Sequence, residues 1–140
     1  MKEFVLGLVF DPKREHIILI DRLKDPYNLK LNGIGGKVDF GETPELAIQR
    51  ELKEETGFSM DEILLCDFVL TVEFKEDSSK LHVFYIKLKD KFPIRIHKTH
   101  EGTFAWHKLS DVNLLDGSDE KIAGDGSMAF FTKFILERRA

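Results

Sequence analysis

The sequence is poor in features that would place it in a membrane or in an oxidising compartment. Cys66 is the only cysteine in 140 residues, so no internal disulfide can form and a reducing compartment is favoured. The apolar run at residues 4–10 is too short to span a bilayer, and residues 11–15 interrupt it without a small-residue cleavage site. We therefore expect a cytoplasmic protein with no membrane partner.

An excess of basic residues is also absent. Lys and Arg number 21 against 25 Asp and Glu, which gives a formal net charge of −4. Binding to polymeric nucleic acid through its phosphates requires a basic face, so we expect no such partner. A small phosphorylated ligand is compatible with this charge, because a metal ion and a few basic side chains can neutralise it.

The apolar content of the chain is sufficient for a folded core. Hydrophobic residues make up 42% and charged residues 33% of the sequence, which is ordinary for a soluble globular protein. A length of 140 residues suits a single domain over residues 1–140. We expect this domain to act as a monomer or a homodimer.

Strand-like segments alternate with two helical ones. Thr43 suits a helix cap, Pro44 the first helical position and Gly57 the helix end, which predicts a helix between them. Periodic apolar residues predict a second helix at residues 128–139. Strand-like runs lie at residues 4–10, 16–20, 64–75, 80–89 and 103–109. This order predicts an α/β fold in which a mixed sheet packs against helices.

A glycine-rich segment lies between the second strand and the first helix. Three glycines fall within residues 33–36. The backbone there needs either positive φ angles or the close approach of another group. We expect a turn at Gly35 and Gly36 that presents bare backbone groups to a metal or a phosphate.

The first helix carries three glutamates at a spacing that suggests a metal site. Glu51, Glu54 and Glu55 stand at positions i, i+3 and i+4, which project from one side of a helix. Crowded carboxylates repel one another unless a cation lies between them, and Mg²⁺ prefers oxygen ligands. A metal ion there could lower the pKa of a bound water, whose proton one of the carboxylates could accept.

The same helix is also compatible with a solvated, salt-bridged surface. Arg50 and Lys53 could simply pair with the glutamates around them. Glu42 and the preceding glycines favour the metal site instead. Glu42 precedes the helix, where the helix dipole stabilises a carboxylate, and Arg50 is placed to pair with Glu54 or to hold Glu42.

Residues 36–58 resemble the Nudix box, the pattern G-x5-E-x7-R-E-U-x-E-E-x-G-U in which U is a bulky aliphatic or similar residue. Phe58 is the one loose fit, because an aliphatic residue is more usual there. The strand pattern around the box also resembles the Nudix fold, an α/β/α sandwich with a mixed sheet. Every defined position is occupied, by Gly36, Glu42, Arg50, Glu51, Leu52, Glu54, Glu55, Gly57 and Phe58.

This resemblance implies a hydrolase that uses Mg²⁺ or Mn²⁺ to cleave a nucleoside diphosphate linked to another group. It implies a catalytic set that consists of Arg50 and the three helical glutamates. The metal would be surrounded by those glutamates and by the backbone of Gly35 and Gly36. Glu101 resembles an additional metal-binding glutamate of the MutT-type group.

A second motif bears on the substrate. Residues 31–37 resemble the Trp-Asn-Gly-Phe-Gly-Gly-Lys run of Nudix enzymes that destroy oxidised purine nucleoside triphosphates, with Leu31 in place of the tryptophan. Asn32 would then hydrogen-bond the edge of the base, since an amide supplies both donor and acceptor. The signatures of Nudix enzymes for ADP-ribose, dinucleoside polyphosphates, coenzyme A and NADH are absent. The resemblance implies substrate contacts from Asn32, Arg22, Lys37, Asp125 and Phe4.

Structural interpretations of these residues stay open. Trp106 is expected in the core rather than against a base. His97 and His100 lie near Glu101, but zinc would require tighter ligand spacing, so we interpret them as loop residues. Asn32 could instead be a turn residue, and Arg22 could be a solvated strand end. Asp125 could cap a helix, and Phe4 could belong to the core.

The sequence therefore predicts a MutT-type Nudix hydrolase of the nucleotide pool. It would split a nucleoside triphosphate, such as 8-oxo-dGTP or a related purine, into monophosphate and pyrophosphate. One alternative is another nucleoside-diphosphate-linked substrate: a nucleotide sugar, ADP-ribose or a pterin triphosphate. The other is a non-catalytic nucleotide-sensing Nudix module, although such modules often lose the box glutamates that this chain keeps.

Overall fold

A computed structural model describes residues 1–22, 31–96, 98–112, 121 and 127–140. The helical elements are α1 (Pro44–Thr56), the short 3-10 helix η1 (Met60–Glu62) and α2 (Ser127–Arg138). The strands are β1 (Lys2–Phe10), β2 (His16–Arg22), β3 (Leu31–Asn32), β4 (Ile34–Lys37), β5 (Ile63–Phe74), β6 (Ser79–Leu88), β7 (Lys98–Thr99) and β8 (Gly102–Lys108). Within these ranges, no helix is both long enough and apolar enough to cross a membrane.

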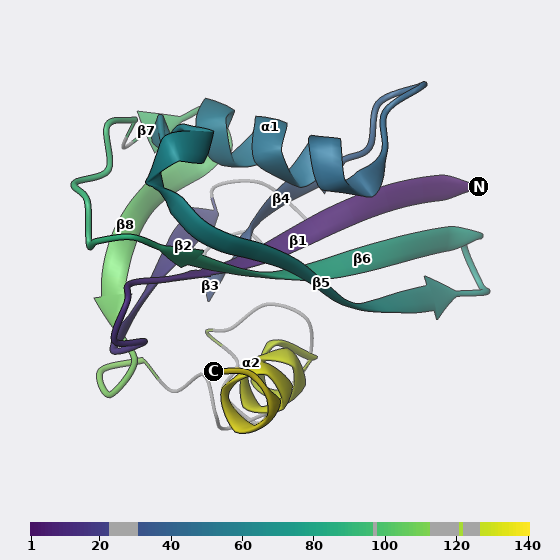
Figure 1. Cartoon of the computed structure of the whole chain (residues 1–140). Coiled ribbons are helices and arrows are strands. Elements are labelled where there is room, and N and C mark those ends of the chain that lie inside the picture. The colour runs from purple at the N-terminus through teal and green to yellow at the C-terminus, as the bar shows by residue number, and fades with distance from the viewer. Residues whose placement is uncertain (23–30, 97, 113–120, 122–126) are drawn as a thin grey trace.

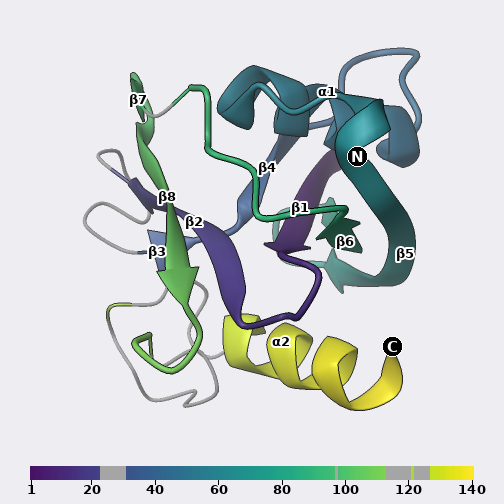
Figure 2. The same cartoon turned by 60° about the vertical axis from the view of Figure 1, so that its left-hand side comes forward.

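The two long helices cover opposite faces of one mixed sheet (Figure 1, Figure 2). The strand order is β5-β6-β1-β2-β8-β7, with β3 paired to β2 and β4 paired to β1. β1 and β6 run parallel, and the other pairs are antiparallel. This arrangement confirms the predicted α/β/α sandwich with a mixed sheet.

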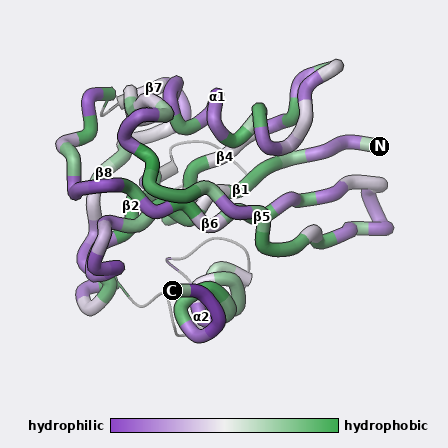
Figure 3. The backbone as a smooth tube through the Cα atoms, viewed as in Figure 1, coloured by the Kyte–Doolittle hydropathy of each residue, from purple (hydrophilic) through white to green (hydrophobic). Residues whose placement is uncertain are grey.

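Strand β1 holds the two cores together because both of its faces are buried. Val5 and Val9 face α1 and pack in one apolar cluster with Ile48. Leu8 faces the other way and packs in a second cluster with Phe131 of α2. Successive side chains of a strand point to opposite faces, so one continuous apolar run serves two layers. The middle of β1 is hydrophobic and its start is hydrophilic (Figure 3).

Helix α1 begins and ends where its sequence predicts. The Thr43 hydroxyl accepts a hydrogen bond from the Leu46 amide at 3.2 Å. Gly57 adopts a φ of 83° and donates its amide to the Lys53 carbonyl at 2.9 Å. These caps satisfy backbone groups that a helix leaves unpaired at its ends.

The glycine-rich segment is a strand, and the predicted turn at Gly35 and Gly36 is wrong. Gly35 and Gly36 belong to β4 and lie opposite Leu6 and Val5 of β1. The described glycines with positive φ are Gly41, Gly57 and Gly102. Close approach is the reason for glycine here: a Cβ on Gly36 would lie 2.6 Å from the Glu51 carboxylate. The bare strand lets this carboxylate lie directly against the sheet.

The remaining elements agree with most of the sequence predictions. Trp106 packs against the α1-side core and donates its indole N–H to the Phe92 carbonyl at 2.8 Å, so its predicted core role is confirmed. The strand-like runs at residues 4–10 and 16–20 pair as the β1–β2 hairpin, and those at residues 64–75 and 80–89 pair as the β5–β6 hairpin. The short elements β3, η1 and β7 were not predicted, because two or three residues carry too little periodicity to be recognised.

Candidate active site

Arg50 joins three segments of the chain at the centre of the site. Its Nε and Nη2 donate to the two carboxylate oxygens of Glu42 at 2.8 and 3.0 Å. Nη1 donates to Glu51 at 2.8 Å, and Nη2 also donates to the Lys37 carbonyl at 3.0 Å. A guanidinium suits this role because its donors form a rigid planar fork. Arg50 thereby ties α1 to β4 and to the loop that precedes the helix.

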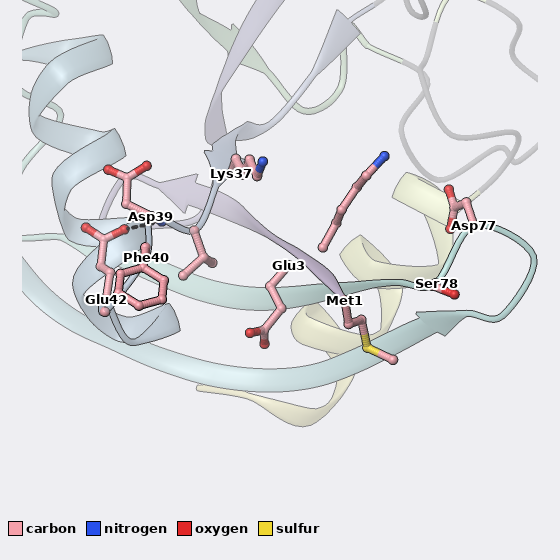
Figure 4. Close-up of a pocket in the computed structure, with 11 residues that line it drawn as sticks. Met1, Glu3, Lys37, Asp39, Phe40, Glu42, Asp77 and Ser78 are labelled. Carbon is pink, nitrogen blue, oxygen red and sulfur yellow. Dashed lines mark hydrogen bonds between the residues drawn. The ribbon is translucent and has the colours of Figure 1, made fainter.

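Glu42 is held as a carboxylate. The hydrogen bonds from Arg50, followed by the Asp39 amide, lower the pKa of Glu42 from 4.5 to about 2. The Asp39 amide donates to Glu42 at 3.0 Å across the loop that carries the exposed Phe40 (Figure 4). The prediction that Arg50 would hold Glu42 in position agrees with these contacts.

Glu55 and Glu51 form a close carboxylate pair. Glu55 is only 7% exposed. Burial raises its pKa well above the usual range, and the hydrogen bond to Glu51 and the charges of Glu51 and Glu101 raise it further, whereas the Gly35 amide opposes the shift. Two carboxylates this close repel each other when both are ionised, which is one reason why the pKa of Glu55 is raised.

Glu54 lies apart from this pair. Its side chain is 59% exposed and contacts Arg50 at 3.3 Å. The i, i+4 residues Glu51 and Glu55 therefore converge, while the i+3 residue is turned toward solvent. Among the described residues, no three His, Cys, Asp or Glu side chains are already close enough to hold a metal ion. Arg50 pairs with Glu42, Glu51 and Glu54 in this arrangement.

The chemistry of these groups fits a hard divalent cation. The charged side chains that act on Glu55 are those of Glu51 and Glu101, whose carboxylate oxygens are ligands that Mg²⁺ and Mn²⁺ accept. The charges of Glu51 and Glu101 disfavour ionisation of Glu55, and a dication in the same place would reverse that effect. The missing side chain of Gly36 leaves the Glu51 carboxylate beside bare backbone.

Glu101 reaches this region from the far end of the sequence. It lies in the turn between β7 and β8 beside His100, and its amide donates to the Thr99 hydroxyl at 3.2 Å. His100 is a turn residue, as expected, and His97 lies outside the described residues. The charge of Glu101 acts on Glu55, so the structure brings these two carboxylates near each other.

A cavity of about 780 Å³ is lined by Gly36, against which the Glu51 carboxylate lies. Gly36, Asn32 and Phe4 line it from the strands, and Phe74 of β5 and Phe130 of α2 line its other walls. Phe74 and Phe130 are 47% and 58% exposed although both are large and apolar. Neither was predicted as a site residue, since a pattern of strand and helix residues does not tell which exposed aromatics meet in space.

Lys37 is close to both the 780 Å³ cavity and the Arg50 network of carboxylates. It is paired with Phe4 across β1 and β4, so the two side chains leave the same face of the sheet. It also lines a second cavity of about 600 Å³ together with Glu3, Asp39 and Glu42 (Figure 4). Lys37 therefore lies between the 780 Å³ cavity, which its partner Phe4 lines, and the carboxylates that Arg50 binds.

Two predicted substrate residues are not placed by the structure. The backbone of Arg22 ends β2 opposite Gly102, and its side chain lies outside the described part of the molecule. Asp125 also lies outside the described residues.

The comparison with protein families identifies the class. The model of the NUDIX domain matches residues 3–124. The chain belongs to the NUDIX domain family. The oxidized purine nucleoside triphosphate hydrolase of Danio rerio is 44% identical over 61 residues, a match that covers 43% of this chain and only 37% of that relative.

Solved structures with the same fold cover nearly the whole chain. MutT of Aliivibrio salmonicida and Vibrio cholerae matches with a TM-score of 0.66 and 20% identity over 96% of both chains. The NUDIX domain of Shewanella oneidensis NrtR, complexed with ADP ribose, matches with a TM-score of 0.74 and 17% identity over 97% of this chain and 86% of that one. A C. elegans Ap4A hydrolase matches with a TM-score of 0.68 and 19% identity over 98% and 99%. At these identities the likeness establishes the shared fold.

Proposed function

We propose that residues 1–140 form one hydrolase domain that cleaves a nucleoside diphosphate linked to another group. The first candidate reaction converts a nucleoside triphosphate, such as 8-oxo-dGTP or a related purine, into monophosphate and pyrophosphate. The observation that carries the proposal is that Gly36, against which the Glu51 carboxylate lies, also lines a cavity of about 780 Å³. The single cysteine supports a cytoplasmic location, and a monomer or homodimer suffices for this chemistry.

Mg²⁺ or Mn²⁺ would be held by four glutamates and by the backbone of two glycines. When bound, the divalent cation neutralises charge on phosphate oxygens and lowers the pKa of a coordinated water. The residues in this role are Glu51, Glu54, Glu55 and Glu101, with Gly35 and Gly36. Arg50 acts as a positioning residue, because it fixes Glu51 and Glu42 relative to β4. One carboxylate of the coupled set accepts the proton of the attacking water.

The organic part of the substrate would occupy the cavity on the α2 side. A ligand whose phosphates lie beside Glu51 can extend past Gly36 toward Asn32 and Phe4, which line the same cavity. Phe74 and Phe130 offer aromatic faces to a planar ring. Lys37, Arg22 and Asp125 remain predicted contacts to the substrate. The 44% identity over 61 residues to the oxidized purine nucleoside triphosphate hydrolase of Danio rerio supports an oxidised purine nucleotide as the substrate.

The decisive test is a panel of nucleotides incubated with the protein and Mg²⁺. Nucleoside triphosphates, their oxidised forms, nucleotide sugars, ADP-ribose and pterin triphosphate are compared by released monophosphate and pyrophosphate. We expect the highest kcat/KM for an oxidised purine triphosphate. Turnover of none of these compounds, with tight nucleotide binding, would instead establish the sensing module.

A matched pair of variants tests the carboxylate assignment. Glu54→Gln should reduce kcat by about 100-fold or more, because a displaced or missing charge in a preorganised site has effects of that size. Glu45→Gln, an exposed position of the same helix outside the Arg50 network, should retain wild-type kcat. Equal kcat values for both folded variants would refute the metal assignment.

A further inference from the structure

The second cavity, of about 600 Å³, lies at the start of β1 and borders the Arg50 network (Figure 4). Glu42, which Arg50 binds, lines this cavity. Glu51, which Arg50 also binds, lies against Gly36 of the 780 Å³ cavity. Lys37 follows Gly36 in the chain and lines the second cavity. A substrate with two ends can therefore place one end in each cavity and its middle beside these carboxylates.

Two lysines of the second cavity have free side chains. Lys2 and Lys37 both line it, and both are exposed. Lys37 is paired with Phe4 across β4 and β1, and Lys2 precedes Phe4 by two residues on β1. Residues two apart on a strand share a face, so both lysine side chains leave the same face of the sheet. Neither ammonium group has an ion pair or a hydrogen bond with the described residues.

Four carboxylates also line the second cavity, and Arg50 holds two of them. Glu42 accepts hydrogen bonds from Arg50 at both oxygens, and Asp39 lies 3.5 Å from the Arg50 Nε. A guanidinium that binds these carboxylates neutralises much of their charge. They therefore compete little with an anion for Lys2 and Lys37.

The other two carboxylates, Glu3 and Asp77, have partners of their own. Glu3 leaves β1 on the opposite face from the two lysines and hydrogen-bonds with Nε2 of His82 at 2.8 Å. Asp77 accepts the Ser79 hydroxyl at 2.6 Å. Within the described part of the chain, the two lysines are thus the charged side chains of this cavity that are left without a partner.

The backbone that carries Lys2 is held on both sides. The Lys2 amide donates to the Ser78 carbonyl at 3.1 Å, and the Glu3 carbonyl accepts the Val38 amide at 2.9 Å. A lysine on a paired strand has a fixed Cα position, so binding an anion orders only its side chain.

We propose that the second cavity binds the group linked to the nucleoside diphosphate, and that Lys2 selects an anionic group such as a terminal phosphate. The nucleoside then occupies the 780 Å³ cavity, and the phosphates between the two ends lie beside Glu51. A neutral sugar in the second cavity would gain no charge-assisted hydrogen bond from the ammonium groups. This inference rests on the proposed function. It assigns the substrate class as nucleoside polyphosphates in preference to nucleotide sugars.

The first test compares two substrates that share one purine nucleoside, the triphosphate and the diphosphate sugar. Lys2→Gln should raise KM for the triphosphate about tenfold, the size of one lost charge-assisted hydrogen bond. KM for the sugar should stay within about twofold. Lys13→Gln, an exposed lysine in the β1–β2 turn, is the matched control and should leave both KM values unchanged. Equal effects of Lys2→Gln on both substrates, or no effect on either, would overturn the inference.

Inorganic pyrophosphate is the second probe, because it carries the anionic group without a nucleoside. In calorimetric titrations with Mg²⁺ present, Lys2→Gln should weaken its Kd about tenfold. Lys2→Arg keeps the charge and should stay within about threefold of wild type. Lys13→Gln should bind as wild type does. The same Kd in wild type and Lys2→Gln would overturn the inference.

Failure of the inference can be distinguished from failure of the proposed function. Triphosphate turnover with the same KM in wild type and Lys2→Gln would overturn only the inference. Absence of both nucleotide turnover and pyrophosphate binding in the wild type would overturn both.

Discussion

Two arginine–glutamate pairs flank α1, and their chemistry is nearly the same. Arg50 binds both oxygens of Glu42 ahead of the helix, and Arg95 binds both oxygens of Glu62 beyond its end. In each pair the arginine hydrogen bonds lower the pKa of the glutamate from 4.5 to about 2. A lowered carboxylate pKa therefore does not by itself mark a functional site in this protein.

The neighbours of the two arginines make the difference. Arg95 also donates to the carbonyl of Gly57 at 3.1 Å and stacks over the Phe58 ring, so it closes the end of α1. Arg50 instead donates to further carboxylates and to a β4 carbonyl. The Arg95–Glu62 pair has a backbone carbonyl and an aromatic ring as its neighbours, so its role is structural. The Arg50–Glu42 pair has further carboxylates beside it, so it can serve catalysis.

The largest contrast should come from removing each arginine. Arg50→Ala leaves Glu42, Glu51 and Glu54 without their shared cation, and we expect kcat/KM to fall by about 100- to 1,000-fold. Arg95→Ala should lower the melting temperature but keep kcat/KM within about threefold of wild type. Steady-state kinetics and thermal melts of both variants check this. Comparable losses of kcat/KM would remove the distinction between the two pairs.

Gly36 lies beside Glu51 in the Arg50 network and Gly57 lies beside Arg95, so substitutions of these two glycines give a second contrast. Gly36→Ala places a Cβ within 2.6 Å of the Glu51 carboxylate, and we expect about 10- to 100-fold lower kcat from the displaced carboxylate. Gly57→Ala forces a φ of 83° on alanine and places its Cβ 2.9 Å from that of Arg95. It should cost about 1–2 kcal/mol of stability with kcat nearly unchanged. Kinetics and denaturant unfolding distinguish the outcomes.

Metal binding should stabilise the folded protein through the glutamates near Arg50 and independently of the Arg95–Glu62 pair. At a free Mg²⁺ concentration of about 100 times Kd, the free energy of unfolding of wild type should rise by about 2.7 kcal/mol. Arg95→Ala should show the same increase, and Glu51→Gln should show much less. Chelation should abolish turnover in every active variant. A metal-induced increase in Glu51→Gln as large as in wild type would place the metal elsewhere.

The smallest expected effect is the stability that the Arg95–Glu62 pair loses in acid. The pKa of Glu62 is lower in the folded than in the unfolded chain, so the folded protein binds fewer protons and loses stability as pH falls. The contribution is fully present above the unfolded pKa of 4.5 and disappears as pH approaches about 2. The melting-temperature difference between wild type and Glu62→Gln should shrink over this window. A constant difference from about pH 6 to 2.5 would assign it to packing instead of charge.

Local patterns along the chain were sufficient for much of the fold. The caps at Thr43 and Gly57 act within one helical turn, so they can be recognised in any sequence that contains them. The alternation of apolar strands with two helices indicated the layered α/β architecture in the same way. The Nudix-box positions located the Arg50 and Glu51 region before any packing was known.

Packing decided the features that depend on distant residues. Glu54 and Glu55 are adjacent in sequence, yet one is exposed and the other buried, because only the sheet beside α1 determines which side of the helix is covered. The Arg95–Glu62 pair was not predicted, because neither local sequence indicates that these two residues are neighbours.

The sequence by itself determined which chemical groups this protein carries, where α1 begins and ends, and the family to which it belongs. Tertiary structure decided that Gly35 and Gly36 form a strand, that Glu101 approaches Glu55, and that Asn32 and Gly36 line the same cavity. The physical reason is range: capping and spacing act over a few residues, whereas burial, the approach of distant carboxylates and the shape of a cavity depend on which elements pack together.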